Sequence, residues 1–370
     1  MRLTPAFVGS SARLRLLRAS SLAAYGLLNL RQRGPRVLIG RAREWIRATR
    51  QYDSAVTMAP QEIDWSQRSA VAPGQQRRQA TTPIVSVVVR TRDRPDDLEL
   101  ALNSLATQTF HDFEIVVVND GGRSVEEILA PYRGEMSLTH VANVTSHGRA
   151  EATNDGVRAA RGRFVSFLDD DDVVYPFHLE SLVEAAEGGA PDGFVYSHYS
   201  RVLVDGRGRD AIVIGKARVP IWPFNRCELL VTNRPAIHTW LLPRALFESH
   251  GGFDDTFQIL HDWDFLLRVT EHSTLVSVPE ETCEYRFYLD LDNSVTGGRR
   301  RVLEELQRMY ALHRSGSALV TLARRIQIAE VRQQIALASE LDEKVDAGLV
   351  TRREAARAFV GIVFSMGPTE

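Results

Sequence analysis

Three short apolar runs, each followed at once by polar residues, give the middle of the chain its pattern. They are residues 84–89 (IVSVVV), 114–118 (EIVVV) and 164–168 (FVSFL). Continuous runs of this length and composition are typical of strands buried on both faces of a parallel sheet. Leu98, Leu102 and Leu105 follow the first run at helical spacing. Because strands alternate with helices, the pattern predicts an α/β domain with a mostly parallel central sheet flanked by helices.

Helical patterns recur along the rest of the chain. They predict helices over 124–131 and 148–160, a helix that begins near Asp262, and several helices after residue 299. Thr351 and Glu354 have the spacing of a capping box, in which each side chain bonds to the backbone amide of the other residue. A last short helix is therefore expected to begin there.

The first eighty residues differ in character from the rest. Residues 1–50 carry eleven arginines and a single acidic residue, Glu44, with leucines interleaved. This pattern is typical of a helix on an anionic membrane surface, and it also fits an arginine-rich helical hairpin that packs on the main domain or on another subunit. The apolar stretch 19–30 is too short to span a bilayer. Residues 66–82 have the composition of a linker.

The chain is thus expected to have four parts. They are a basic helical arm (1–65), a linker (66–82), an α/β domain (83–298) and a helical C-terminal region (299–370). Apolar residues make up 44% and charged residues 25% of the chain, as in ordinary globular proteins. A net charge of -2 predicts no bulk affinity for nucleic acid. Two cysteines, Cys227 and Cys283, form no disulfide framework and indicate a reducing compartment such as the cytoplasm.

Four consecutive aspartates, Asp169 to Asp172, end the third apolar run. In open α/β sheets ligands bind outside the carboxyl ends of the strands, so the cluster lies where a site is expected. At about 5 Å and an effective dielectric near 20, each like-charged pair costs roughly 3 kcal/mol, so these groups need a cation, water or raised pKa values. Asp169 and Asp171 suit Mg²⁺ or Mn²⁺, which prefer oxygen ligands. For Asp172 a solvated turn that caps the next helix is expected instead.

Acidic residues also follow the other two strands. Asp93 lies just after the first run and Asp120 just after the second. Since parallel strands end at one edge of the sheet, these residues and Asp169 are expected to lie together there. Three acidic turns on one edge form a candidate site for a polyphosphate and a ribose.

The order of these segments resembles the nucleotide-sugar domain of family 2 inverting glycosyltransferases, which have the GT-A fold. The resemblance is carried by PIVSVVVRTRDRP, SLATQTFHDFEIVVVNDGG and HGRAEATNDGVRAARGRFVSFLDDDD, and more loosely by GGFDD and HDWDFLLR. It covers about residues 83–172 closely and extends to about residue 296. It implies a Rossmann-like GT-A domain that transfers a sugar from a nucleoside diphosphate sugar, with a UDP-sugar as the expected donor.

The resemblance also implies a role for particular residues. Thr91, Asp93 and Asp120 would hold the nucleoside, and Arg149 would lie near the diphosphate unless it is simply an exposed helix residue. Asp170 would reach the donor ribose or sugar. Asp169 and Asp171 would hold the Mn²⁺ or Mg²⁺.

Asp262 would be the catalytic base, which takes the proton of an acceptor hydroxyl as that oxygen attacks the anomeric carbon. An aspartate in a first helical turn can also be a simple cap. His261 departs from the family pattern, in which an acidic residue is frequent at this position. His238 is expected to be a hydrogen-bonded core residue rather than an acceptor contact.

The implied function is metal-dependent transfer of a sugar to a carbohydrate or glycolipid hydroxyl, in bacterial-type surface polysaccharide or glycoconjugate synthesis. The enzyme would lie in the cytoplasm, with the basic arm of residues 1–50 as a candidate contact with the inner face of the membrane. One alternative is a non-catalytic GT-A-like scaffold that binds nucleotide or carbohydrate. A remoter one is a haloacid-dehalogenase-type phosphohydrolase, because residues 164–173 also match its strand and D-x-D-x-V pattern. That enzyme needs a downstream basic residue and a later acidic pair, which this chain offers poorly.

Overall fold

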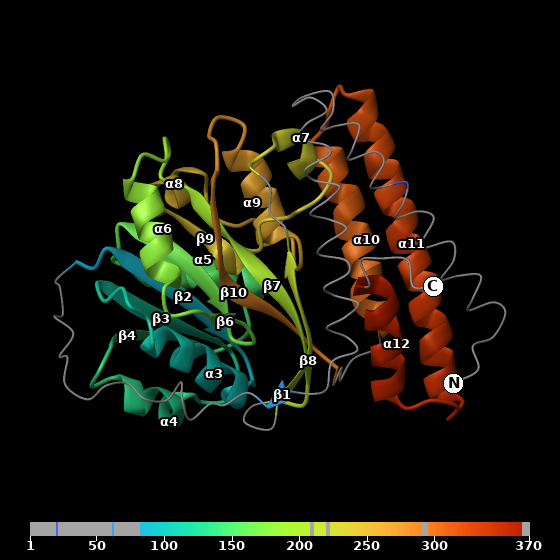
Figure 1. Cartoon of the computed structure of the whole chain (residues 1–370), viewed down its shortest axis with the longest axis horizontal. Helices are drawn as coiled ribbons and strands as arrows, with labels where there is room; N and C mark the ends of the chain where they lie inside the picture. The colour runs from blue at the N-terminus through green and yellow to red at the C-terminus, as the bar shows by residue number, and fades with distance from the viewer. Residues whose placement is uncertain are drawn as a thin grey trace.

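The computed structural model describes residues 20, 61–62, 82–207, 211–219, 223–289 and 295–364, with the side chains of 295–297 and 360–364 left out. Their central feature is a ten-stranded mixed sheet in the order β1-β8-β7-β9-β5-β2-β3-β4, with β10 paired to β7 and β6 paired to β10. Figure 1 shows helices around this sheet and a separate group of helices at one side of it.

One half of the sheet is entirely parallel. Its strands are β2 (Val85–Thr91), β3 (Phe113–Asp120), β4 (Ser137–Asn143) and β5 (Phe164–Asp169). Strand β2 lies between β3 and β5, and its register sets Arg90 opposite Asp169 and Thr91 opposite Asn119. The three predicted runs are therefore confirmed as neighbouring buried strands. Their carboxyl ends meet at one edge, as predicted.

The other half of the sheet mixes parallel and antiparallel pairs. Its strands are β1 (Gln61–Glu62), β6 (Val173–Val174), β7 (Val195–Asp205), β8 (Ile212–Val219), β9 (Trp240–Pro243) and β10 (Val276–Tyr288). Strand β9 joins the halves because it pairs antiparallel with both β5 and β7. Strand β10 runs parallel to β7 with two register shifts, between Val278 and Cys283. The central sheet is thus parallel in its first half and mixed in its second.

Helices cover both faces of the sheet (Figure 1). They are α3 (Pro95–Ala106), α4 (Glu126–Leu129), α5 (Arg149–Ala159), α6 (His178–Glu187), α7 (Arg226–Leu229), α8 (Arg244–Ser249) and α9 (His261–Val269), with 3-10 turns at Ala130–Tyr132 and Ile237–Thr239. On one face Gly156 of α5 packs directly on Val88, and Phe167 contacts Phe247 and Phe253. This aromatic cluster joins α8 and the turn before α9 to the parallel strands.

Three helices form the C-terminal part of the described chain. They are α10 (Val295–Leu312), α11 (Ala318–Asp346) and α12 (Arg352–Phe364). Leu306 and Met309 of α10 belong to the main hydrophobic core, so α10 is continuous with the α/β domain although the predicted boundary at residue 298 falls within it. The predicted capping box is confirmed, since Glu354 accepts from the Thr351 amide at 2.8 Å and its own amide donates to the Thr351 hydroxyl at 3.2 Å.

Most of the predicted basic arm and linker lies outside the described residues. Of residues 1–60 only Ser20 is described, and it is helical. Gln61 and Glu62, at the end of the predicted arm, instead form strand β1, which pairs antiparallel with β8. Among the described residues, no helix is both long enough and apolar enough to cross a bilayer.

Candidate active site

The acidic cluster lies at the carboxyl ends of the parallel strands. It is paired with basic side chains from β2 and from the turn that follows β2. Arg90 of β2 bonds to Asp169 of β5, its register partner. Arg94, just before α3, donates to Asp171 Oδ2 at 2.5 Å and lies 3.0 Å from Asp170 Oδ1. These pairs offset the repulsion among the aspartates with cations supplied by the chain itself.

Burial and charge separate the aspartates electrostatically. Burial raises the pKa of Asp169, but Arg90 and Arg149 outweigh it and hold that pKa well below its usual range. Asp170 is 3% exposed, and burial raises its pKa to about 7 although Arg94 acts in the opposite direction. The cluster is therefore anionic at Asp169, whereas Asp170 can hold a proton near neutral pH.

Asp172 differs from its expected role as a solvated cap, because it is 1% exposed. Its Oδ2 pairs with His238 Nδ1 at 3.0 Å, and its Oδ1 accepts from the Arg286 amide at 2.8 Å. Burial raises the pKa of Asp172 to about 6, and the His238 charge opposes this shift. His238 itself is 1% exposed, which confirms it as a core residue. The two residues anchor the turn after β5.

The arrangement fits a divalent cation. Asp169, Asp171 and Asp172 each offer a carboxylate oxygen, and these oxygens all lie within 4.8 Å of one another. Hard cations such as Mg²⁺ and Mn²⁺ prefer a set of this kind. The two predicted ligands, Asp171 and Asp169, have similar side-chain exposures of 29% and 28%, so both can be reached from solvent.

Two of the predicted nucleoside residues lie at the end of β2. The Thr91 hydroxyl is buried and donates to Asp170 Oδ2 at 2.8 Å. Asp93 has a φ of 55°, which is uncommon for a residue other than glycine, and its Oδ1 accepts from the Arg123 amide at 2.9 Å. Thr91 thus joins the acidic cluster, while the Asp93 side chain faces solvent at 49% exposure.

Asp120 is saturated with hydrogen bonds. It accepts from the Ser146 hydroxyl at 2.7 Å, from the amides of His147 and Gly148 at 2.7 and 3.1 Å, and from Asn143 Nδ2 at 3.2 Å. Burial raises the pKa of Asp120, but these bonds outweigh it and keep the pKa below its usual value. In this structure Asp120 fixes the loop that leads into α5.

Arg149 is the first residue of α5, and its side chain is exposed. Its charge lowers the pKa of Asp169 and also that of His261, so it lies within electrostatic reach of both. The helix start therefore brings a cation to the rim of the acidic cluster.

Asp262 approaches the same cluster from α9. Its Oδ2 accepts from Asn233 Nδ2 at 2.7 Å, and its Oδ1 accepts from the Trp263 amide at 2.7 Å. Burial, with a smaller contribution from the charge of Asp169, raises the pKa of Asp262 to about 6. A carboxylate with this pKa is mostly ionised at neutral pH yet can accept a proton.

The loop before Asp262 is held by the C-terminal helices. Glu305 of α10 is 8% exposed, and its carboxylate accepts from the amides of Gln258, Ile259 and Leu260, each at 2.9 Å. Three charge-assisted bonds to one carboxylate fix the backbone at the start of α9. The position of Asp262 thus depends on α10.

The other ionisable residues of α9 are tied to structural partners. Asp264 is 3% exposed and accepts from Arg268 Nε at 2.7 Å, with His313 Nε2 at 2.8 Å from its other oxygen. Burial lowers the pKa of His261 to about 3, so this residue is neutral at physiological pH. It packs edge-on against Phe253. Asp262 is therefore the acid of this helix that is open to chemistry.

Several residues of the site were not singled out from the sequence. Arg90 and Arg94 stand in the segment RTRDRP, which begins at the end of β2, and its arginines beside a predicted acidic cluster were the available signal. Asn233 and Glu305 gave no signal, because their contacts with α9 and its preceding loop come from distant parts of the chain. The pairing of His238 with Asp172 likewise depends on the fold.

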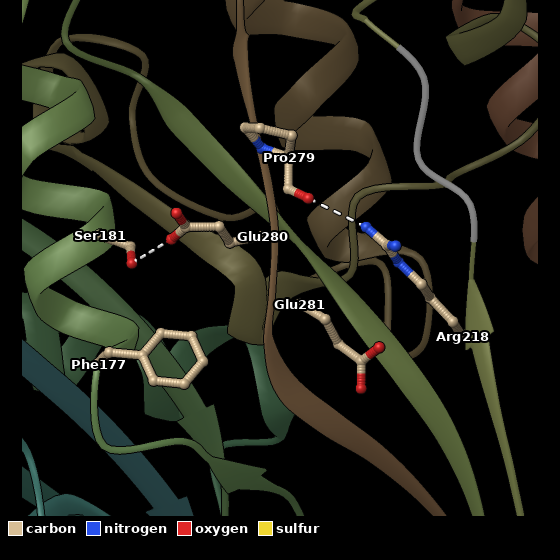
Figure 2. Close-up of a pocket in the computed structure, with 6 residues that line it drawn as sticks. All are labelled: Phe177, Ser181, Arg218, Pro279, Glu280 and Glu281. Carbon is tan, nitrogen blue, oxygen red and sulfur yellow. Dashed lines mark hydrogen bonds between the residues drawn. The ribbon is translucent and has the colours of Figure 1, made fainter.

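A separate pocket of about 580 Å³ opens beside β10 (Figure 2). Its lining residues are Phe177, Ser181, Arg218, Pro279, Glu280 and Glu281, none of which is a predicted site residue. Ser181 donates to Glu280 at 2.5 Å, and Arg218 donates to the Pro279 carbonyl at 3.0 Å. Its exposed aromatic ring and charged groups differ in kind from the acidic cluster.

Comparison with known proteins places this site in a family. The model of the family described as "Glycosyl transferase family 2" matches residues 86–249. A PGL/p-HBAD biosynthesis glycosyltransferase of Mycobacterium bovis is 30% identical over 201 residues, which cover 53% of this chain and 73% of that protein. An uncharacterized glycosyltransferase of Rickettsia prowazekii is 26% identical over 202 residues, or 52% of this chain and 61% of that protein.

A solved structure extends the likeness to nearly the whole chain. Mannosyltransferase PcManGT from Pyrobaculum calidifontis, in complex with GDP-Man and Mn²⁺, superposes with a TM-score of 0.52 at 16% identity, and the match covers 96% of this chain and 97% of that one. At this identity the likeness concerns the fold alone. It confirms the predicted GT-A architecture.

Proposed function

The chain belongs to glycosyl transferase family 2 and is a glycosyltransferase, and we propose that it moves a sugar from a nucleoside diphosphate sugar to a hydroxyl acceptor with inversion at the anomeric carbon. The observation that carries this proposal is the meeting of two kinds of carboxylate at one strand edge. Asp169 and Asp171 belong to a group of aspartates whose oxygens lie within 4.8 Å of one another, and Asp262, with its pKa raised to about 6, lies within electrostatic reach of Asp169.

We assign the donor to the ends of β2, β3 and β5. Thr91, Asp93 and Asp120 would line the nucleoside side, and Asp170 would meet the ribose or sugar. Arg149 would face the diphosphate from the start of α5, because its charge lies within electrostatic reach of Asp169. Both nucleotide classes need testing, since UDP is the expectation from the sequence while the mannosyltransferase neighbour is named for GDP-Man.

Asp169 and Asp171 would hold Mn²⁺ or Mg²⁺. Such an ion neutralises the departing nucleoside diphosphate. Asp262 would take the proton of the acceptor hydroxyl at one carboxylate oxygen while Asn233 holds the other. The Trp263 amide and Glu305 would fix the base in place.

The acceptor is proposed to be a carbohydrate or glycolipid of a bacterial-type surface polysaccharide or glycoconjugate pathway. Support comes from the relative named for PGL/p-HBAD biosynthesis. We propose a cytoplasmic enzyme whose basic arm meets an anionic membrane. Salt-sensitive sedimentation of the full chain with anionic liposomes, which a chain beginning at Pro83 should lack, tests that contact.

The test of the function begins with a panel of UDP- and GDP-sugars, scanned by thermal shift with and without Mn²⁺. We expect one donor to raise the melting temperature only when Mn²⁺ is present, and Asp171→Ala to abolish the shift. The selected donor then serves in transfer assays with hydroxyl acceptors, in which NMR of the product reports the anomeric configuration. Equal donor affinity in EDTA would remove the metal from the mechanism, and a retained configuration would rule out the inverting reaction.

A further inference from the structure

We propose that Arg94 competes with the divalent metal for Asp171, and that the bound metal releases the Arg94 guanidinium to the donor diphosphate. The inference rests on the proposed metal-dependent binding of the donor. It assigns Arg94 two successive partners, the carboxylates of the empty site and the phosphates of the loaded one. Arg94 is thus a donor-binding residue in the loaded site and a counter-charge in the resting site.

The first observation is that the carboxylate in contact with Arg94 also belongs to the proposed metal site. Asp171 accepts from Arg94 Nη1 at 2.5 Å, and Asp171 is also one of the three aspartates whose oxygens lie within 4.8 Å of one another. Asp170, at 3.0 Å, completes the Arg94 contact. A divalent ion beside Asp171 would share this carboxylate with Arg94 and would be repelled by the nearby guanidinium.

The second observation is that, among the cations in direct contact with the aspartates, Arg94 is the one best able to move. Arg90 lies within β2, is 15% exposed, and faces Asp169 in strand register. His238 is 1% exposed and fixed on Asp172. Arg94 follows the strand, precedes the first residue of α3, and is 34% exposed. Its side chain can therefore leave the carboxylates without a change in the sheet.

The third observation is charge balance. An apo site with Asp169 and Asp171 ionised holds excess negative charge at a strand edge, which Arg90 and Arg94 offset. A bound divalent ion would supply the positive charge instead, so Arg94 would no longer be needed to offset the aspartates. The donor diphosphate arrives at the same edge, and guanidinium groups bind phosphate oxygens in a forked geometry.

A purely structural clamp makes the opposite prediction. If Arg94 only holds the aspartates in a metal-binding arrangement, its removal disorders them and lowers the affinity for the metal. If Arg94 competes with the metal, its removal raises that affinity. The sign of the change in metal affinity therefore separates the two roles.

The experiment measures Mn²⁺ binding by titration calorimetry to the full chain without nucleotide. We expect Arg94→Gln to bind Mn²⁺ about tenfold more tightly than the parent, a change of about 1.4 kcal/mol, because the guanidinium no longer occupies Asp171 or repels the ion. Arg92→Gln is the matched control, since Arg92 is 57% exposed and its recorded ion pair is with Asp93 at 4.0 Å. Its Mn²⁺ affinity should change less than about twofold.

A second measurement tests the release toward phosphate. At saturating Mn²⁺, UDP and GDP should bind Arg94→Gln about tenfold more weakly than the parent for whichever nucleotide the parent prefers. Arg94→Lys keeps the charge but not the fork, so its Mn²⁺ affinity should fall between those of the parent and Arg94→Gln. It also serves as the test variant if Arg94→Gln loses its thermal transition.

The outcomes distinguish the inference from the function beneath it. If the parent binds no Mn²⁺, the metal part of the proposed function fails and the inference falls with it. If the parent binds Mn²⁺ and the Arg94 variants bind it equally or more weakly, the competition is refuted while the proposed function stands. Tighter Mn²⁺ binding with unchanged nucleotide affinity refutes the transfer of Arg94 to the diphosphate.

Discussion

The two halves of the site are built in different ways. At the ends of β2, β3 and β5, the donor half, Asp169, Asp170 and Asp171 are held by Arg90, Thr91 and Arg94 from the neighbouring strand and its turn. In the acceptor half, around Asp262, the contacts come from Asn233 and from the Glu305 clamp on the preceding loop. The donor half therefore follows from strand register, whereas the acceptor half needs the packing of distant segments.

Because of this difference, the two halves are expected to respond differently to mutation. Residues of the donor half share charge among several partners, so single changes there, apart from those at the proposed metal ligands Asp169 and Asp171, are expected to redistribute contacts. The proposed acceptor half contributes one carboxylate, Asp262, to the proposed proton transfer. Loss of that carboxylate, or of its support, should act on the chemical step while donor binding persists.

The largest effect is expected from Asp262→Asn. A general base contributes about 10² to 10⁴ in rate, and asparagine caps helices about as well as aspartate. We expect sugar transfer to fall at least about a hundredfold, with the melting temperature and donor affinity nearly unchanged. Initial rates, calorimetric donor titrations and thermal melting check these three quantities.

Asp255→Asn is the matched control, because Asp255 is an exposed aspartate just before the same helix. It should transfer sugar at the parent rate. Loss of fold together with activity in Asp262→Asn would make Asp262 a structural cap. Transfer at the parent rate would leave the non-catalytic scaffold, or another base, as the explanation.

The pH dependence of transfer is the next test of the acceptor half. Burial raises the pKa of Asp262 to about 6, and only the ionised carboxylate can accept a proton. At saturating donor, kcat should therefore fall with decreasing pH below about 6, approaching tenfold for each pH unit. It should level off above that pH. A rate that is flat between pH 5 and pH 7 would contradict the role of Asp262.

Residual transfer by Asp262→Asn should lack this acidic limb. A limb that persists in the variant would belong to another group. Asp170 is the candidate for that group, because burial raises its pKa to about 7, close to that of Asp262. The comparison of the two profiles thus assigns the limb to one half of the site.

Glu305→Gln tests whether α10 positions the base. An amide cannot accept from all three backbone donors, so we expect kcat to fall about tenfold and the free energy of unfolding to fall by about 2 kcal/mol. Donor affinity should stay at the parent value. Steady-state kinetics and denaturant unfolding provide the measurements.

Glu304→Gln is the control, since Glu304 is the exposed neighbour on the same helix. It should behave as the parent in both measurements. A loss of stability in Glu305→Gln without a change in kcat would confine Glu305 to a structural role. An equal loss of donor affinity would show that α10 supports both halves.

The sequence was most informative for the donor half. Buried parallel strands are continuous apolar runs, and the polar residues that end them, Asp120 and Asp169, lie at one edge for topological reasons. Strand β4 was not foreseen, because its residues are mostly half-buried and produce no apolar run. The parallel core and its acidic edge thus follow from local pattern.

Long-range pairs explain what the sequence did not predict. Asp172 looks like part of an acidic turn, but a histidine from a later segment, His238, buries and neutralises it. Glu305 looks like an ordinary charged position of an amphipathic helix until the 258–260 amides are placed against it. Burial and partner choice at these positions are properties of the assembled fold.

The smallest effect on transfer is expected in the donor half, from Asp120→Asn compared with Asp93→Asn. Asp120 accepts four hydrogen bonds and is 4% exposed, whereas the Asp93 side chain is 49% exposed and accepts from one backbone amide. Asparagine in place of Asp120 would turn an NH₂ group toward a backbone N–H or a hydroxyl of the loop before α5.

We therefore expect Asp120→Asn to lower the free energy of unfolding by about 1 to 3 kcal/mol, the usual cost of an unsatisfied buried group. Asp93→Asn should change it by less than about 0.5 kcal/mol, because asparagine tolerates a positive φ as aspartate does. Both variants should weaken donor binding by several-fold or less, measured by titration with the preferred nucleotide. Equal stability of the two variants would mean that Asp120 does not anchor the loop, and a far larger loss of donor affinity in Asp120→Asn would make its contact with the nucleoside the dominant role.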